Sequence, residues 1–91
     1  MHYFYIIFSK KINRYYSGET CDPKNRLKQH NDGYYDKAFT KVAKDWEIVL
    51  IKKYKTRKET LEIEKFVKKM KSKKFIEKII KNPAILDEIK F

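Results

Sequence analysis

The segment Tyr3-Phe4-Tyr5-Ile6-Ile7-Phe8 decides the fold, because it is a near-continuous apolar run of aromatic and β-branched residues. Such a run predicts a strand that is covered on both faces. The polar connection 9–13 follows, and Arg14-Tyr15-Tyr16-Ser17-Gly18 resumes as a short second strand. We therefore expect an antiparallel hairpin in which each strand carries a tyrosine, Tyr5 and Tyr16.

The middle of the chain predicts a helix, a loop and a third strand. Asp22-Pro23 is typical of an N-cap and first helical position, so a helix is expected from there to about His30. Residues 34–45 have no clean period and predict a loop. Residues 46–54 alternate apolar and polar, as a strand does. That alternation places two sets of side chains on opposite faces: Trp46, Ile48 and Leu50 against Val49 and Ile51.

Two further helices are expected near the C-terminal end. Thr56-x-x-Glu59 matches a capping box, and apolar residues follow it at helical spacing. These residues are Leu61, Ile63, Phe66, Val67 and Met70. Ser72 can cap another helix, which Asn82-Pro83 ends. The order β-β-α-β-α-α predicts an α+β fold with a three-stranded sheet, as a single domain over residues 1–91.

Composition limits the classes of function. The 91 residues include 23 Lys+Arg against 12 Asp+Glu, a net charge of +11, which attracts polyanions and favours nucleic acid as the partner. A lysine-rich genome would produce part of the same excess. Cys21 is the only cysteine, so no internal disulfide can form, and a reducing cytoplasm is expected. No apolar stretch has the length of a membrane span, and the apolar start is too short for a signal peptide.

Several motifs together carry a family resemblance. Tyr3-Phe4-Tyr5, then Tyr16-Ser17-Gly18, then residues 20–31 are similar to the GIY-YIG nuclease domain in its small stand-alone bacterial form, as in the N-terminal domain of excision-repair nucleases. The match extends over most of the chain, through residues 41–49, 56–68 and 82–83. Four positions depart from the family pattern. Tyr3 and Phe4 replace Gly and Ile, Ser17 replaces Ile, and Glu19 stands where some relatives have a lysine.

The resemblance implies hydrolysis of DNA phosphodiester bonds with one divalent metal, Mg²⁺ or Mn²⁺, and no other small-molecule cofactor. It is also the reason to expect a role in DNA repair. Tyr16 would activate the attacking water, with Tyr5 beside it as a hydrogen-bond partner. Arg26 would contact the scissile phosphate, because a guanidinium suits an oxyanion whose charge rises in the transition state. His30, one turn later on the same helix face, is either a phosphate donor or a residue favoured by the helix C-terminus.

Glu64 is the expected metal ligand. It neighbours the apolar positions Leu61 and Val67, so it should point inward, and a hard cation can use one carboxylate with waters and phosphate oxygens. The alternative is a salt bridge from Glu64 to Lys68, and both can hold together. The substrate contacts implied by the resemblance are Gly18, where the backbone would approach DNA closely, Lys41, Lys68 and Asn82, although Asn82 before a proline is also an ordinary helix stop.

Two other classes of function remain open from sequence. One is a basic nucleic-acid-binding module that keeps the fold without catalysis, and the other is a protein-interaction domain whose lysines reflect genome bias. The lysines among residues 65–74 are either a solvated helix face or a stripe that follows phosphates. Trp46 is expected in the core, and Cys21 has no partner base in the sequence to support a reaction.

Overall fold

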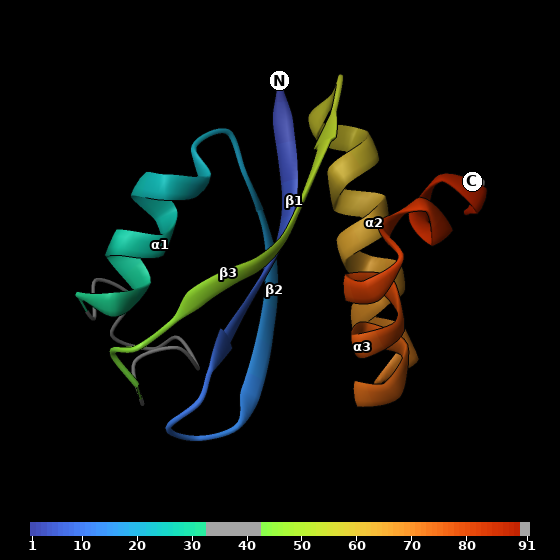
Figure 1. Ribbon diagram of the computed structural model, residues 1–91. Coiled ribbons are helices and arrows are strands. Elements are labelled where there is room, and N and C mark those ends of the chain that lie inside the picture. Colours follow the sequence, from blue (N-terminus) through green and yellow to red (C-terminus); the bar gives the residue numbers. More distant parts are fainter. Residues whose placement is uncertain (33–42, 90–91) are drawn as a thin grey trace.

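The computed structural model describes residues 1–32 and 43–89 (Figure 1). Its elements, in chain order, are β1 (His2–Ser9), β2 (Arg14–Thr20), α1 (Pro23–Asn31), β3 (Glu47–Tyr54), α2 (Arg57–Met70), α3 (Lys73–Lys81) and the 3-10 helix η2 (Pro83–Glu88). This order confirms the predicted α+β class and its β-β-α-β-α-α arrangement. The expected loop over residues 34–45 lies mostly outside the described residues, and so does Lys41.

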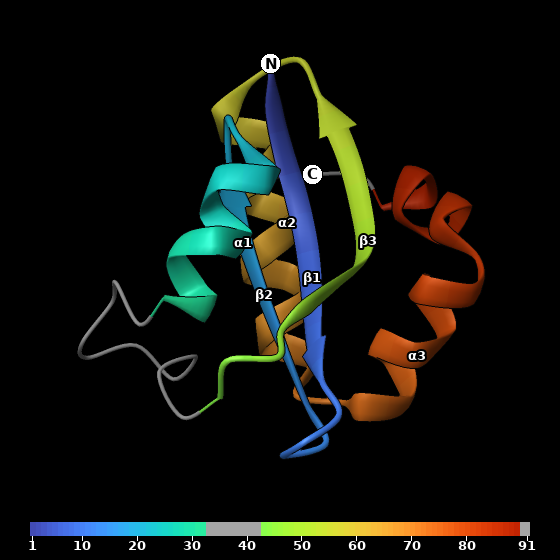
Figure 2. The same ribbon diagram turned by 60° about the vertical axis from the view of Figure 1, so that its left-hand side comes forward.

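The sheet has the strand order β2-β1-β3, with β1 antiparallel to both neighbours. Phe4 and Ile6 of β1 are fully buried under α2 and α3, whereas Tyr5 and Ile7 lie in a second buried cluster with Trp46. The helix α1 lies on one side of the sheet, and α2 and α3 lie on the other (Figures 1 and 2). The central strand is therefore covered on both faces, as its apolar sequence predicted.

The turn between β1 and β2 is fixed to the segment that precedes β3. Asn13 adopts a φ of 53°, in the left-handed region that asparagine tolerates better than most residues. The Ser9 hydroxyl donates to Oδ1 of Asp45 at 2.5 Å, and the Lys11 backbone N–H donates to Oδ2 at 3.1 Å. These bonds, that of Ser9 first, hold the pKa of Asp45 below its usual value. Asp45 thus anchors the turn between β1 and β2.

A β-bulge interrupts β3. Ile6 of β1 lies opposite Leu50, whereas Ile7 lies opposite Ile48, so Val49 is an extra residue between two paired positions. The expectation that Ile48 and Leu50 share one face was therefore wrong. Ile48 packs in the cluster on the α1 side, and Leu50 is buried in the cluster under α2 and α3. Val49 also packs against the cluster under α2 and α3.

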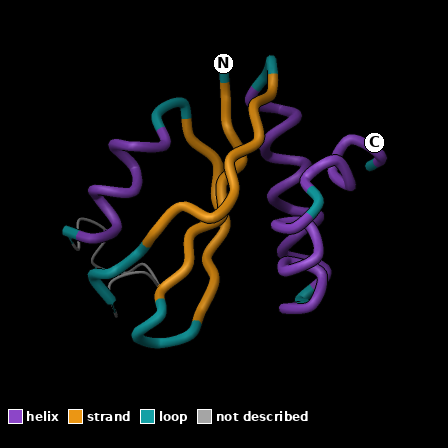
Figure 3. The backbone as a smooth tube through the Cα atoms, in the orientation of Figure 1, coloured by secondary structure: helices purple, strands orange, loops and turns teal. Residues whose placement is uncertain are grey.

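The helix starts agree with their sequence signals. The Asp22 side chain accepts from the backbone N–H of Asn25 at the start of α1. Thr56 accepts from the N–H of Glu59 and donates to its carboxylate, which completes the capping box of α2. Ser72 caps α3 in the same way. Figure 3 shows these three helices flanking the strands.

The buried face of α2 differs from the expected one. Thr60, Ile63 and Val67 are the buried residues of this helix, while Leu61 and Met70 are 42% and 46% exposed. Leu61 and Met70 belong to the apolar positions at helical spacing, but the stripe that contacts the sheet runs through Thr60 instead. Its hydroxyl can be buried because it donates to the Arg57 carbonyl at 2.8 Å.

The segment after Pro83 forms the short helix η2, which the sequence did not predict. Its Leu86 is buried, and it joins the cluster that contains Ile79 of α3. No helix among residues 1–32 and 43–89 combines the length and apolar character that crossing a bilayer requires.

Candidate active site

Tyr16 is the side chain on which residues from two helices converge. It lies on β2, half-buried, and packs against the cluster on the α1 side of the sheet. The His30 ring from α1 meets it edge-on, with ring centroids 5.1 Å apart. The ammonium group of Lys68 from α2 lies 5.5 Å from the centroid of the Tyr16 ring. Because β2 is an outer strand, side chains of α1 and α2 can meet Tyr16 although the two helices flank opposite faces (Figure 2).

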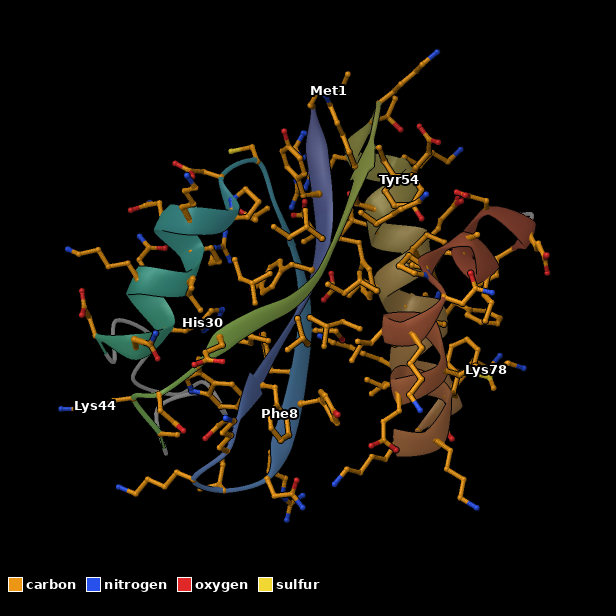
Figure 4. All side chains as sticks on the ribbon, in the orientation of Figure 1. Met1, Phe8, His30, Lys44, Tyr54 and Lys78 are labelled. Atoms are coloured by element: carbon orange, nitrogen blue, oxygen red, sulfur yellow. The ribbon has the colours of Figure 1, made fainter. Side chains whose placement is uncertain are left out.

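Tyr5 and His30 form a buried polar pair behind Tyr16. The Tyr5 hydroxyl and His30 Nε2 are 2.8 Å apart, and both residues are 2% exposed. In Figure 4 the His30 side chain lies on the side of α1 that faces the sheet. Burial, and secondly the nearby charge of Arg26, lowers the pKa of His30 to about 4. His30 is therefore neutral near pH 7, and it acts here as a hydrogen-bond partner of a tyrosine rather than as a cation.

This geometry bears on the two roles expected for His30. The C-cap of α1 is Asp32, and a neutral imidazole gains little from the helix dipole. His30 does lie in the last turn of α1, and its favourable interaction with the helix C-terminus stays a prediction. A direct phosphate contact stays a prediction, and the residue's buried position makes a charged donor unavailable there.

Gly18 makes room for Tyr5. The two residues are directly opposite each other on β2 and β1, and Gly18 is buried. A Cβ atom at Gly18 would lie 2.6 Å from the Tyr5 hydroxyl oxygen and 2.8 Å from Cζ. Real side chains do not approach so closely, so the glycine is required for the position of the phenol. The expected substrate contact at Gly18 stays a prediction, and the structure supplies a second reason for the residue.

Arg26 lies one helical turn before His30 on α1. It is half-buried, and its charge acts on the His30 ring, as the lowered pKa shows. Its backbone N–H bonds to the Asp22 carbonyl in the first turn of the helix. Both side chains therefore lie on the face of α1 that meets the sheet near Tyr16.

Glu64 and Lys68 form the other side of the site. Lys68 Nζ lies 2.8 Å from Oε1 of Glu64, and the Glu64 side chain is 19% exposed. The salt bridge expected as the alternative role of Glu64 is thus present. The second carboxylate oxygen has no hydrogen-bond or ion-pair partner among the described residues. Lys68 contacts both Glu64 and the Tyr16 ring, so it joins the carboxylate to the phenol.

The donor groups fit a hard divalent cation held largely by its own waters and by substrate. Within residues 1–32 and 43–89, no group of three or more His, Cys, Asp or Glu side chains could hold a metal. A zinc-type site is therefore not built by these residues. Mg²⁺ commonly uses one or two protein carboxylates together with water and phosphate oxygens, and the open oxygen of Glu64 suits that arrangement.

Asn31 is a positioning residue that the sequence did not single out. Its side-chain oxygen accepts from the backbone N–H of Trp46 at 2.8 Å, and its amide nitrogen donates to the Trp46 carbonyl at 3.0 Å. These two hydrogen bonds tie the end of α1, and with it His30, to the start of β3. The sequence gives no signal for it, because an asparagine at a helix end also fits an ordinary stop. Trp46 itself is buried, as expected.

Comparison with known proteins identifies the family. Residues 1–78 match the GIY-YIG catalytic domain. The chain belongs to the GIY-YIG family. Over 73 residues it is 37% identical to the UPF0213 protein YazA of Bacillus subtilis, covering 80% of this chain and 72% of that protein. A UPF0213 protein of Enterococcus faecalis is 35% identical over 74 residues, which are 79% of this chain and 82% of that protein. No solved structure matches the chain significantly.

The family match covers every expected site residue except Asn82. It extends to residue 78, whereas Asn82 lies between α3 and η2 and is exposed. Its backbone N–H bonds to the Lys78 carbonyl, and no hydrogen bond of the described residues joins it to Glu64. Asn82 is the helix stop that its sequence suggested, and its role in the GIY-YIG site stays a prediction.

Glu19 occupies the position where some GIY-YIG relatives carry a lysine. Its carboxylate lies 3.3 Å from Nδ1 of His2 and 3.3 Å from Nε of Arg57. It is thus engaged with neighbouring side chains at the far end of β2. The cation that the structure places at Tyr16 is instead Lys68.

Proposed function

We propose that this GIY-YIG protein is a metal-dependent endonuclease that hydrolyses DNA phosphodiester bonds. The family is one of nucleases, which supports endonuclease activity in general. The observation that carries the specific proposal is the position of Tyr16 between His30 on one side and the Lys68–Glu64 pair on the other. A phenol that only packed in the sheet would not need a cation over its ring that is itself bonded to a carboxylate.

Tyr16 takes the proton of the attacking water in this proposal. The water oxygen forms a bond to phosphorus as its proton passes to the Tyr16 oxygen, which releases its own hydroxyl proton to solvent. The P–O bond opposite the water breaks in line, and the leaving oxygen takes a proton from solvent. The ammonium of Lys68 lies over the Tyr16 ring and holds the ring from the side of α2. The buried Tyr5–His30 pair holds the other edge of the ring in place.

Arg26 binds the scissile phosphate. It lies one helical turn before His30, which meets the Tyr16 ring, its charge acts on the His30 ring, and its planar fork suits two phosphate oxygens. Charge on those oxygens rises in the transition state, so a fixed guanidinium stabilises that state more than the ground state. Because His30 is neutral, it adds no positive charge beside Tyr5, and Arg26 is the cation of α1 that binds the phosphate.

Glu64 would hold the divalent ion through its open oxygen, with Mg²⁺ or Mn²⁺ as the candidates. When bound, such an ion polarises phosphate oxygens and stabilises the charge that develops on them. Lys68 is bonded to the same carboxylate, so it fixes the direction in which Glu64 points. The donor set gives no reason for a further cofactor.

DNA is the proposed partner, and the net charge of +11 supports it. The cytoplasm is the proposed compartment, because the single cysteine, Cys21, is exposed and cannot form an internal disulfide. We also propose a role in DNA repair, which depends on whether the protein cuts the DNA structures that arise in repair.

Purified protein with labelled single-stranded, duplex and branched DNA tests the activity. We expect cleavage with Mg²⁺ or Mn²⁺, none with EDTA, and none from Tyr16→Phe, while Tyr3→Phe, at a half-buried tyrosine outside this group, cuts at the parent rate. Binding of these DNAs without cleavage of any of them, in either metal, would instead establish the inert binding module.

A further inference from the structure

We propose that a groove beside Tyr16 binds one unpaired nucleotide of the substrate strand, with its base against Tyr15 and its flanking phosphates on Arg14, Lys71 and Lys73. This inference rests on the proposed nuclease function and adds the form of nucleic acid that the same site takes. It assigns residues outside the group that would perform the hydrolysis.

The groove follows the outer edge of β2, where the strand meets the junction of α2 and α3. Its volume is about 410 Å³, and one part of its wall is formed by Tyr16 and Lys68. The remaining lining residues are Asn13, Arg14, Tyr15, Ser17, Val67, Lys71, Ser72, Lys73 and Ile76. A strand whose phosphate is at Tyr16 would therefore continue into this groove without leaving the protein surface.

The charge of the groove is of one sign. Arg14, Lys71 and Lys73 line it together with Lys68, and the described lining residues include no Asp or Glu. Within the described part of the chain, Arg14, Lys71 and Lys73 take part in no ion pair, whereas Lys68 is bonded to Glu64. These three charges form no ion pair within the described part of the chain, so they are available to the phosphates of a strand, although the carboxylate of Glu77 acts on the Tyr15 ring from nearby.

Tyr15 supplies an aromatic surface within the same groove. It is directly opposite Phe8 on the neighbouring strand, and the two ring centroids are 4.7 Å apart, so Phe8 fixes the position of the tyrosine ring. Lys73 Nζ lies 5.9 Å from the Tyr15 centroid. An aromatic ring among cations is the combination by which proteins bind single strands: the ring stacks with a base, and the cations follow the backbone.

The stacking surface selects the form of the nucleic acid. A base within a duplex is stacked on its neighbours and presents no free face to a tyrosine, so a base on Tyr15 must be unpaired. Backbone contacts alone would accept a duplex equally well. Tyr15 is therefore the residue that should separate single-stranded from duplex binding, and the cations should affect both.

Binding measurements on non-cleaving protein test the groove. In a Glu64→Gln background, we expect Tyr15→Leu to weaken binding of a labelled mixed-sequence single-stranded oligodeoxynucleotide about 5- to 150-fold, the range for loss of one stacked base. Blunt duplex of the same sequence should bind as before. Tyr15→Phe keeps the ring and should bind both as the parent does. Equal weakening of both ligands, or none, in a variant with a parent-like melting curve would overturn the proposal.

If Tyr15→Leu fails to fold, a variant of exposed groove lysines tests the proposal instead. The double variant Lys71→Gln/Lys73→Gln should reduce the log–log salt slope of single-strand binding by about 1.4, from about 0.7 per phosphate contact. The matched control is Lys58→Gln/Lys78→Gln, two exposed lysines that do not line the groove and whose loss changes net charge equally. Equal effects of the two double variants would mean that only net charge matters, and would overturn the groove. Binding of poly-glutamate as tight as that of DNA would do the same.

The two proposals fail in different ways. If wild-type protein cuts no DNA but Tyr15→Leu selectively loses single-strand binding, the groove stands and the nuclease proposal falls. If wild-type protein cuts DNA and Tyr15→Leu binds both ligands as the parent does, the nuclease stands and the groove falls.

Discussion

The Tyr5 hydroxyl lies 2.8 Å from Nε2 of His30, in a pair that is almost completely buried. The contact joins the central strand to the end of α1 across 25 residues of sequence. Burial, and secondly the charge of Arg26, keeps this histidine neutral next to Tyr16. The proposed water-activating tyrosine therefore has an uncharged imidazole on one side and the ammonium of Lys68 over its ring.

Stability should therefore depend on pH through His30. Its pKa is 6.5 in a model peptide and about 4 in the fold, so the unfolded chain binds a proton first as pH falls. The unfolding free energy should decrease between pH 6.5 and 4, by up to about 3 kcal/mol at roughly 1.4 kcal/mol per pKa unit. Denaturant unfolding of wild type and His30→Gln measures this. The stability difference between the two should shrink over that range, and a constant difference would contradict the assignment. His2→Gln is the control for loss of a histidine.

Gly18→Ala should destabilise the protein by about 1–3 kcal/mol, the range for forcing extra atoms into a packed site. The added Cβ would lie 2.6 Å from the Tyr5 oxygen and 2.8 Å from Cζ. Combining it with Tyr5→Phe removes the nearest of these atoms, so the double variant should lose less stability than the sum of the singles. Denaturant midpoints of the four proteins complete the cycle. Strict additivity would show that the clash is relieved elsewhere.

The sequence predicted the elements well where local signals were strong. The caps at Asp22, Thr56 and Ser72 set the starts of all three helices, because each side chain bonds to a backbone N–H only three residues away. The fold class followed from these starts and from the apolar run of β1. Such local interactions can be predicted from the sequence without knowing which other elements pack against the helix.

The wrong predictions concern side chains whose burial depends on residues distant in the sequence. A bulge at Val49 moves Leu50 to the other face from Ile48, and it depends on pairing with β1, more than forty residues away. Leu61 is exposed because the sheet meets α2 along Thr60 and Ile63 instead. Helical spacing alone does not reveal which of two adjacent stripes is buried.

The residues of the candidate site and the Glu64–Lys68 salt bridge were predicted, whereas the bond of Tyr5 to His30 was not. The spacing of Arg26 and His30 gave their common helix face, yet nothing local indicated that His30 is buried against Tyr5. Likewise, Glu64 was recognised as a carboxylate on α2, and its link through Lys68 to the Tyr16 ring depends on the packing of α2 beside β2. Asn82 has no contact with the site among the described residues, and Lys41 lies outside them.

Glu64→Gln should abolish cleavage and leave the fold and DNA affinity nearly unchanged. The Glu64–Lys68 pair is on the helix surface, so its loss costs only a few tenths of a kcal/mol. Single-turnover cleavage, melting curves and Mn²⁺ titration by calorimetry on the same preparations provide the readouts. Glu62→Gln on the same helix is the matched control and should retain activity and Mn²⁺ binding. Wild-type cleavage by Glu64→Gln at saturating metal would refute the carboxylate's role.

Tyr16→Phe and Arg26→Ala should each slow the chemical step by about 10²–10³-fold or more, the scale of losing one preorganised stabilising group. Their effects should be less than additive in the double variant, because a water-activating phenol and a phosphate-binding guanidinium act on one transition state. Tyr16→Phe keeps the ring that meets His30 edge-on and lies beneath Lys68, so its melting temperature should stay close to that of wild type. Single-turnover rates at saturating protein separate this loss from weaker binding. If Tyr16→Phe cuts DNA at the parent rate while Arg26→Ala does not, Tyr16 serves packing alone and another group takes the proton from water.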